Sequence, residues 1–195
     1  MKKSKYNKTY WDEKYADNQT GWDIGSISTP LKSYFEQIKN KEISILIPGA
    51  GNSYEAEYLF NNGFRNVTII DIALQPLLNL KHRIPKIKDN FLVHEDFFDH
   101  KGSYDLIIEQ TFFCALDPKL RVAYAKKMKE LLKLNGKLVG VLFNRTFDHV
   151  GPPFGGNIKE YKTLFSQYFN IHTLSASYNS ILPRRDQEVF INFEK

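Results

Sequence analysis

One stretch constrains the fold more than any other. It is ISILIPGAGNSYEAEYLFNNG, residues 43–63, in which an apolar run typical of a buried strand leads through Gly49 and Gly51 into a helix-like segment. Helix starts present free N–H groups and a partial positive charge. In an open α/β sheet, ligands bind beyond the carboxyl ends of the strands. The stretch therefore predicts the start of a nucleotide-binding sheet, with an ordinary strand-to-helix turn as the alternative.

The rest of the chain alternates in the same way, which predicts a mostly parallel sheet with helices on both faces. Further strands are expected in NVTIID, NFLVHEDFF, YDLIIEQ and KLVGVLF. Further helices are expected in STPLKSYFEQI, ALQPLLNLKHRI, PKLRVAYAKKMKELLKL and IKEYKTLFSQYF. The last strand-like segments, NIHTLSASYNS and QEVFINFEK, lie close together in the chain. They predict a hairpin that adds antiparallel strands at one side of the sheet.

Local signals suggest where some of these elements begin and end. Asn52 can cap the helix after the glycine turn, and Glu55, three residues later, is placed to complete a capping box. Gly63 is placed to end that helix. Asn135 and Gly136 predict a turn between the long helix and the strand after it.

The bulk properties narrow the class of protein. A chain of 195 residues suits one domain with a single core, so we expect residues 1–195 to form one domain. No apolar run approaches the roughly 20 residues that span a bilayer. The basic start MKKSKYNKTYW has no apolar segment behind it, unlike a secretory signal. Together with the single cysteine, these features predict a cytoplasmic protein without a membrane partner.

The charge pattern bears on possible partners. The net charge is +5, but the lysines are scattered among acids apart from the N-terminal tail. Nucleic-acid binders usually concentrate their basic residues on one face or arm. We therefore expect a small-molecule partner and no nucleic acid. Nothing in the sequence sets the oligomeric state, and a monomer is favoured.

The residues after the strands indicate which ligand the turn binds. A dinucleotide fingerprint needs a third glycine three residues after the second, where Tyr54 stands. Asp71 ends the second strand about twenty residues after the glycines, where an acid accepts hydrogen bonds from ribose hydroxyls. Ribose without pyrophosphate suggests S-adenosylmethionine. Asp96 could meet the adenine amino group, with Phe97 against the ring face, although a solvated loop acid is the alternative for Asp96.

On these residues the chain resembles the thiopurine methyltransferase family, a branch of the class I S-adenosylmethionine-dependent methyltransferases that also includes plant thiol and halide methyltransferases. The similar segments span nearly the whole chain: YWDEKYADNQTGWDIG, LIPGAGNSYEAEYL, IDIA, EDFFD, YDLIIEQTFFCALDPKLRVAYAKKMKELLKLNGKLVGVLF and GPPFGGNIKEYKTLF. The resemblance implies a Rossmann-like α/β fold with a mostly parallel seven-stranded sheet. It also implies an N-terminal lid over residues 1–40 and a core over residues 41–195.

The resemblance further implies a set of site residues. The cofactor site would be formed by Trp11, Tyr15, Trp22, Gly49, Gly51, Asp71, Asp96, Phe97 and Glu109. Glu109 and Gln110 stand where relatives often show aspartate and arginine, which puts the charge of the pocket in question. Arg121 matches a family arginine close to cofactor and substrate, and it is the candidate catalytic residue because its permanent charge would favour a thiolate. The alternative for Arg121 is a surface ion pair.

Other residues leave alternatives open. Trp11 and Trp22 could hold a sulfonium by cation–π attraction, or simply pin an N-terminal helix to the core. Cys114 is expected to be a small buried hydrophobe rather than a nucleophile. Arg184 and Arg185 lie where the family tends to place an arginine near substrate, although a solvated turn explains them as well. The spacing of the histidines and acids around EDFFD fits no strong zinc pattern, so no metal is expected.

The function expected from all this is methyl transfer from S-adenosylmethionine, which yields S-adenosylhomocysteine. The acceptor would be a small nucleophile, most simply a thiol, a related sulfur or selenium compound, or a halide. The alternatives are an O- or N-methyltransferase acting on a small metabolite and a non-catalytic protein that binds S-adenosylmethionine. A nucleotide-linked oxidoreductase is disfavoured by Tyr54.

Overall fold

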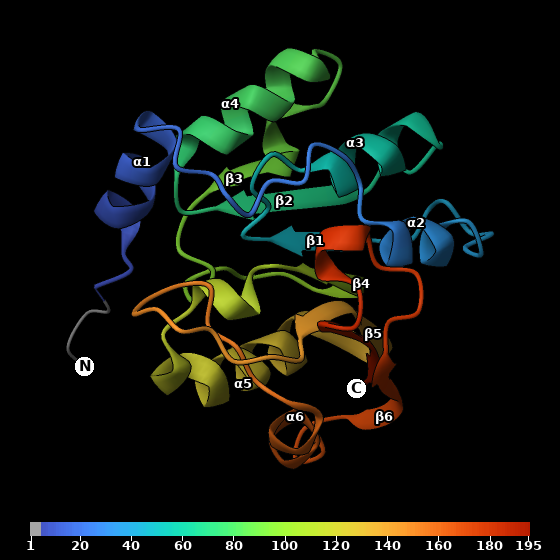
Figure 1. Ribbon diagram of the computed structural model, residues 1–195. Coiled ribbons are helices and arrows are strands. Elements are labelled where there is room, and N and C mark those ends of the chain that lie inside the picture. The colour runs from blue at the N-terminus through green and yellow to red at the C-terminus, as the bar shows by residue number, and fades with distance from the viewer. Residues whose placement is uncertain (1–4) are drawn as a thin grey trace.

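A computed structural model describes residues 5–195, so the first four residues of the expected lid lie outside the described part (Figure 1). The strands are β1 (Ile45–Pro48), β2 (Val67–Asp71), β3 (Leu92–His94), β4 (Tyr104–Gln110), β5 (Leu132–Phe143), β6 (Asn170–Ala176) and β7 (Glu188–Glu194). They form one seven-stranded sheet in the order β3-β2-β1-β4-β5-β7-β6. The first five strands are parallel, and β7 runs antiparallel to both β5 and β6. The predicted mostly parallel sheet with a C-terminal hairpin is confirmed.

The helices cover both faces of this sheet (Figure 1). They are α1 (Lys8–Ala16), α2 (Thr29–Phe35), α3 (Tyr54–Asn61), α4 (Leu74–Arg83), α5 (Arg121–Leu131) and α6 (Ile158–Phe165). Helices α2, α3 and α4 lie on one face, whereas α5 and α6 lie on the other. Short 3₁₀ turns at Asp89–Phe91, Phe113–Ala115, Pro118–Leu120 and Leu182–Arg184 lie in the connections.

The alternation of side chains along each strand explains the two layers. In β1, Ile45 and Ile47 pack against the helices on one face, and Leu46 packs against those on the other. All four residues of β1 are buried, as expected for a central parallel strand covered on both sides. The connections from β1, β2 and β4 begin at the same edge of the sheet. Residues that follow these strands can therefore share one site.

Two local expectations were wrong. The cap of α3 is Ser53, in a left-handed conformation and without a side-chain cap bond. Asn52 instead donates a hydrogen bond to Asp23, and Glu55 accepts one from the backbone N–H of Ser28 at 3.0 Å. Both side chains hold the N-terminal segment rather than the helix end, because that segment lies over the turn.

The predicted turn at Asn135 and Gly136 also differs. These residues lie within β5, where the pairing with β4 jumps from Tyr104 opposite Leu132 to Leu106 opposite Lys137. Asn135 takes a positive φ of 61° in this irregular stretch. The dipeptide therefore produces a bulge in a strand and not a break between two elements.

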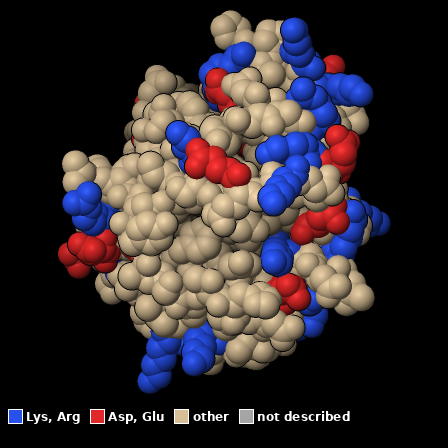
Figure 2. All heavy atoms as spheres, turned by 90° about the vertical axis from the view of Figure 1, so that its right-hand side faces the viewer, with Lys and Arg blue, Asp and Glu red and all other residues tan. Residues whose placement is uncertain are grey.

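The surface gives no sign of a concentrated basic region on the face drawn in Figure 2, where basic and acidic side chains lie beside one another. Within residues 5–195, no helix is both long enough and apolar enough to cross a membrane.

Candidate active site

The glycine turn packs closely against the end of β4. Gly49 and Gly51 both have positive φ, at +57° and +52°. A Cβ atom on Gly49 would lie 2.0 Å from the ring of Phe112, which follows β4. Only glycine is compatible with both the backbone conformation and this approach. A Cβ atom on Gly51 would instead meet the Tyr15 hydroxyl and Trp22 Nε1 at 3.6 Å, an ordinary contact distance.

Asp71, the last residue of β2, lies beneath this turn. Its Oδ2 accepts a hydrogen bond from Gly51 N at 3.2 Å, and its Oδ1 accepts one from Ala73 N at 2.9 Å. No cation within residues 5–195 forms an ion pair with it. Burial raises the pKa of Asp71 to about 6, although the backbone N–H donors oppose the rise. An ionised carboxylate of this kind retains lone pairs that can accept hydroxyl donors from a ligand.

Aromatic side chains from the N-terminal segment cover the turn. The rings of Tyr15 and Trp22 meet edge to face with centroids 5.6 Å apart, and Trp11 meets Trp22 in the same way at 5.5 Å. Burial and the nearby Asp71 charge raise the pKa of Tyr15, so its hydroxyl stays neutral. The structure therefore brings the three expected lid aromatics together and places Tyr15 and Trp22 over Gly51.

The charges around the turn suit a cationic ligand. Asp12 lies near enough to contribute to the raised pKa of Asp71, and Asp23 contributes likewise to that of Tyr15. Acids that surround a binding site favour positive charge and repel phosphate. Asp71 also offers the hydrogen-bond acceptors that ribose hydroxyls require. These features fit S-adenosylmethionine, with its sulfonium and ammonium groups, better than a dinucleotide with its pyrophosphate.

Two expected cofactor residues are packed inside the protein. The Phe97 ring is 4% exposed and meets Phe112 edge to face with centroids 5.1 Å apart. Glu109 is completely buried and accepts hydrogen bonds from Phe112 N at 2.8 Å, Phe113 N at 2.9 Å and the Tyr124 hydroxyl at 2.5 Å. In this conformation neither reaches the surface of the turn. Glu109 instead fixes the segment that carries Phe112.

Asp96 has the opposite environment. Its side chain is exposed, and Oδ1 accepts a hydrogen bond from Phe98 N at 2.9 Å. This is the geometry of a loop acid that stabilises its own turn. The free oxygen of the carboxylate remains available to a donor from solvent or from a ligand.

Arg121 lines a separate cavity. It is the first residue of α5, and its Nη2 donates to Gly155 O at 2.5 Å while its Nη1 lies 3.6 Å from Glu160 Oε2. The cavity has a volume of about 430 Å³ and lies between the start of α5 and the loop of residues 144–157. Nε of Arg121 is buried and has no hydrogen-bond partner within residues 5–195. Arg121 therefore faces the loop after β5, and within residues 5–195 its hydrogen bond and ion pair are made to that loop and to Glu160 of α6 rather than to Asp71 or the glycine turn.

A chain of aromatic rings links this loop to the lid. Successive ring centroids lie 5.0–5.6 Å apart along the series Phe154, Tyr6, Tyr10, Trp11, Trp22 and Tyr15. The series begins at the loop that Arg121 holds and ends over Gly51. One continuous aromatic cover therefore spans the cofactor turn and the edge of the larger cavity.

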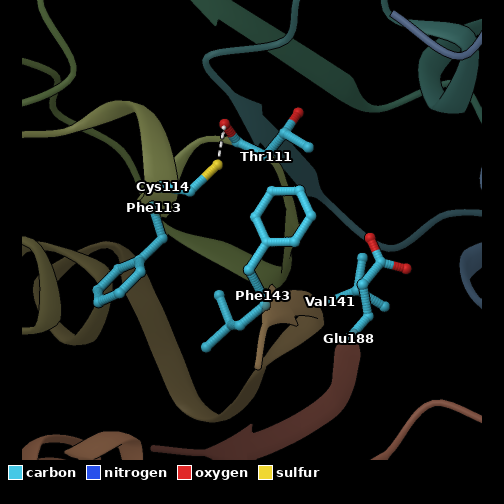
Figure 3. Close-up of a pocket in the computed structure, with 7 residues that line it drawn as sticks. Thr111, Phe113, Cys114, Val141, Phe143 and Glu188 are labelled. Atoms are coloured by element: carbon cyan, nitrogen blue, oxygen red, sulfur yellow. Dashed lines mark hydrogen bonds between the residues drawn. The ribbon is translucent and has the colours of Figure 1, made fainter. Parts of the chain in front are cut away.

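A second, much smaller cavity of about 10 Å³ lies at the carboxyl ends of β4 and β5. Figure 3 shows the ring of Phe143 between Cys114 on one side and the carboxylate of Glu188 on the other. The Cys114 thiol is buried and donates to Thr111 O at 3.2 Å. Burial raises the pKa of Cys114 well above its ordinary value, so the thiol stays neutral. Cys114 is buried, as expected, and it lines this cavity.

Sequence analysis did not identify Glu188 as a site residue. It also gave no reason to expect that Arg184 is buried and Arg185 is exposed. Arg184 is 9% exposed, whereas Arg185 is exposed. Nη2 of Arg184 donates to the Trp22 carbonyl at 2.8 Å, and Nη1 lies 3.3 Å from Glu188 Oε1. Arg184 therefore connects the lid to the first residue of β7. Its family position suggested a substrate-side arginine, but no local signal indicated the partner 162 residues away.

The chain resembles known methyltransferases in sequence and in fold. A family model described as thiopurine S-methyltransferase (TPMT) matches residues 6–195. Thiocyanate methyltransferase 1 of Brassica oleracea is 30% identical over 95% of this chain and 84% of that protein. Thiopurine S-methyltransferase of Vibrio campbellii is 25% identical over 93% of this chain and 96% of that protein.

Among solved structures, the Burkholderia thailandensis 1,6-didemethyltoxoflavin-N1-methyltransferase, with bound 1,6-didemethyltoxoflavin and S-adenosylhomocysteine, superposes with a TM-score of 0.76 at 16% identity. The match covers 96% of this chain and 86% of that one. This likeness identifies the Rossmann-like class I methyltransferase fold.

Proposed function

Because this chain belongs to the thiopurine S-methyltransferase family, we propose that it transfers the methyl group of S-adenosylmethionine to a small nucleophile, most simply a thiol, a related sulfur or selenium compound, or a halide. The chain is an S-adenosylmethionine-dependent methyltransferase. The observation that carries the proposed site is the buried Asp71, which forms no ion pair within residues 5–195 and lies beneath a glycine turn covered by Tyr15 and Trp22. Relatives named for thiocyanate and thiopurine substrates support a sulfur acceptor.

When bound, S-adenosylmethionine supplies a methyl group on a positively charged sulfur, already activated toward a nucleophile. In our proposal, Asp71 accepts the ribose hydroxyls and Gly51 lets the backbone approach the methionine part. Tyr15 and Trp22 cover the sulfonium and exclude water from it. Holding both reactants in line is worth roughly 7–11 kcal/mol in well-oriented cases.

The proposal is tested by methyl transfer to a panel of acceptors: an alkyl thiol, a thiopurine, selenite, iodide, a phenol and an amine. We expect S-methylated product from at least one thiol, identified by mass spectrometry. Cofactor binding by calorimetry without product from any acceptor would instead favour the non-catalytic binding protein. Product from the phenol or amine alone would favour the O- or N-methyltransferase.

Arg121 is proposed to stabilise an anionic acceptor near the larger cavity. Arg121→Ala should lower kcat/KM for the acceptor about tenfold, since it removes a charge and a charge-assisted hydrogen bond to the loop at Gly155. Arg121→Lys keeps the positive charge, so its kcat/KM for the acceptor should fall less than that of Arg121→Ala. Cofactor affinity should not change in either variant. Arg65→Ala, in the exposed connection between α3 and β2, is the control, and equal rates in all these variants would remove Arg121 from the mechanism.

We extend the proposal to the setting of the enzyme. Residues 1–195 act as one domain, with residues 1–40 as a lid that opens to admit the cofactor. The enzyme is proposed to be cytoplasmic and monomeric, without a nucleic-acid or membrane partner. On the face drawn in Figure 2, basic side chains lie beside acidic ones and form no continuous basic surface. Size-exclusion chromatography with light scattering tests the monomer.

A further inference from the structure

The larger cavity lies at the same edge of the sheet as the glycine turn. Its volume is about 430 Å³, and its lining includes Asn144, the residue directly after β5. Strands β1, β4 and β5 are parallel neighbours, so their carboxyl ends share one edge. Neighbouring strands are about 5 Å apart, which places the ends of β1 and β5 roughly 10 Å apart along that edge. The cavity is therefore separate from the turn but within the length of a small molecule.

The N-terminal segment covers both places. At the cavity, the ring of Tyr6 meets that of the wall residue Phe154 with centroids 5.4 Å apart. A Cβ atom on Gly151, another wall residue, would lie 3.4 Å from the Tyr6 hydroxyl oxygen. At the turn, a Cβ atom on Gly51 would lie 3.6 Å from Trp22 Nε1. A small molecule in the cavity would thus lie under the same lid as the proposed cofactor.

The backbone of the loop after β5 fixes the shape of the cavity. Gly156 N donates a hydrogen bond to Arg145 O at 3.0 Å, and Phe154 N donates one to Cys114 O at 2.7 Å. A Cβ atom on Gly155 would lie 1.9 Å from Arg145 O, so only glycine permits this close crossing of the loop. The cavity is therefore preformed, and a ligand that enters it does not have to order the loop.

The charged part of the lining is mainly basic. Among the described residues, it has the guanidinium groups of Arg121 and Arg145 and one carboxylate, that of Glu160. No carboxylate within residues 5–195 forms an ion pair with Arg145, which donates to Gln187 Oε1 and Thr146 O. Nη1 of Arg121 lies 3.6 Å from Glu160 Oε2, a long contact to a side chain that is 56% exposed. The two guanidinium groups therefore keep donors for another anion.

The uncharged part of the lining suits a flat ligand. Phe147, His149 and Phe154 line the cavity, and the Phe147 and His149 ring centroids lie 5.4 Å apart. The guanidinium of Arg145 lies 4.5 Å from the centroid of the Phe147 ring. Aromatic rings pack well against other rings, and the planar guanidinium group can bind both oxygens of a carboxylate. The volume is within the range of about 300–1,000 Å³ that is usual for small-molecule pockets.

Resting on the proposed sulfur acceptor, we propose that this cavity binds the carboxylate of the methyl acceptor and that Arg145 determines specificity there together with Arg121. The acceptor is then an aromatic thiol that carries a carboxylate group. The carboxylate occupies the cavity, and the thiol is directed along the sheet edge toward the glycine turn. Such an acceptor is anionic near neutral pH, in agreement with the role proposed for Arg121. Glu160 limits the affinity, because its carboxylate repels that of the ligand.

Calorimetry with benzoate and benzamide tests the cavity without any methyl transfer. Both molecules have the same ring, but only benzoate is charged, so the wild type should bind benzoate more tightly. Arg145→Gln should weaken benzoate binding about tenfold, since it removes a charge-assisted hydrogen bond. Glu160→Gln should strengthen benzoate binding about threefold, since it removes a partly exposed opposing charge. A damaged fold cannot produce shifts in opposite directions.

Methyl transfer to two thiols tests whether the ligand of the cavity is the acceptor. The ratio of kcat/KM for 4-mercaptobenzoate to kcat/KM for benzenethiol should fall about tenfold in Arg145→Gln and rise about threefold in Glu160→Gln. The intrinsic reactivities of the two thiols cancel when this ratio is compared between proteins. Arg65→Gln and Glu130→Gln each remove an exposed charge elsewhere and are the matched controls. Both controls should keep the wild-type ratio and the wild-type affinity for benzoate.

The outcomes distinguish this proposal from the proposed function. Equal affinities for benzoate and benzamide, or the same benzoate affinity in Arg145→Gln and the wild type, would overturn the carboxylate site. The expected shifts in benzoate affinity with an unchanged ratio of rates would show that the cavity does not bind the acceptor. Failure of the wild type to methylate any thiol, with those shifts still present, would overturn the proposed function and leave an anion site.

Discussion

Asp71→Asn should weaken binding of S-adenosylmethionine and S-adenosylhomocysteine about 100-fold. The carboxylate can accept both ribose hydroxyls, and each hydrogen bond to a charged group contributes about 1.5–3 kcal/mol. The asparagine side chain keeps one acceptor oxygen, which can still accept the hydrogen bond from Ala73 N. Its N–H₂ group replaces the second oxygen and faces Gly51 N, so two donors then face each other. Calorimetry at pH 8 measures the change.

The same carboxylate predicts a pH dependence of binding. Burial raises the pKa of Asp71 to about 6, and a ligand that prefers the ionised form binds less well once the group is protonated. Wild-type affinity should therefore fall as the pH decreases from 8 to 5, whereas Asp71→Asn should change less. The nearby Asp12 and Asp23 are present in both proteins, so their effect on binding is common to both curves. Asp89→Asn, an exposed carboxylate on another loop, serves as the control. Unchanged affinity in Asp71→Asn would show that the cofactor binds elsewhere.

The position of Asp71 was predictable because it depends on local pattern. An acid that ends a strand about twenty residues after a glycine turn must lie at the same sheet edge as that turn, once the two strands are parallel neighbours. The structure pairs β1 with β2 in parallel and places the Asp71 carboxylate 3.2 Å from Gly51 N. The apolar runs and the closely spaced C-terminal strands predicted the sheet for the same reason. The period of apolar residues and the spacing of strands along the chain depend only on residues that are close in sequence.

The contacts that were missed depend on residues far apart in the chain. Asn52 and Glu55 have the spacing of a capping box, but the N-terminal segment supplies stronger partners in Asp23 and Ser28 N. Arg184 has an ordinary loop sequence around it, and its burial results from the Trp22 carbonyl and from Glu188. No local rule assigns such partners, because they meet only after the lid and the hairpin connection have folded against each other.

Burial explains why Phe97 and Glu109 are the weakest of the expected cofactor contacts. Both follow or end strands at the correct edge of the sheet, so the sequence placed them near the ligand. The structure directs their side chains inward instead, where Phe97 packs on Phe112 and Tyr124 and Glu109 binds the Phe112 and Phe113 N–H groups. Edge position is set by the strand, whereas side-chain direction at a strand end is set by tertiary packing.

Glu109→Gln should remove a pH dependence of stability that the wild type shows. Burial raises the pKa of Glu109 from 4.5 to about 7, against the opposing effect of its three hydrogen bonds. The folded protein therefore binds more protons than the unfolded chain between these values, so the free energy of unfolding falls as the pH rises from about 4.5 to about 7 and then levels off. The loss between pH 5 and pH 8 should be about 2 kcal/mol from this group.

Glutamine cannot ionise, so the variant lacks this pH-dependent contribution to the free energy of unfolding. Its carbonyl oxygen can keep the bonds to Phe112 N and Phe113 N, while the Tyr124 hydroxyl loses its acceptor at a cost of about 1 kcal/mol that does not depend on pH. The difference in unfolding free energy between variant and wild type should therefore move by about 2 kcal/mol in favour of the variant from pH 5 to pH 8. Urea unfolding at both pH values measures this, with the exposed Glu130→Gln as control. Parallel curves for Glu109→Gln and the wild type would mean that Glu109 ionises in the folded protein as readily as in the unfolded chain.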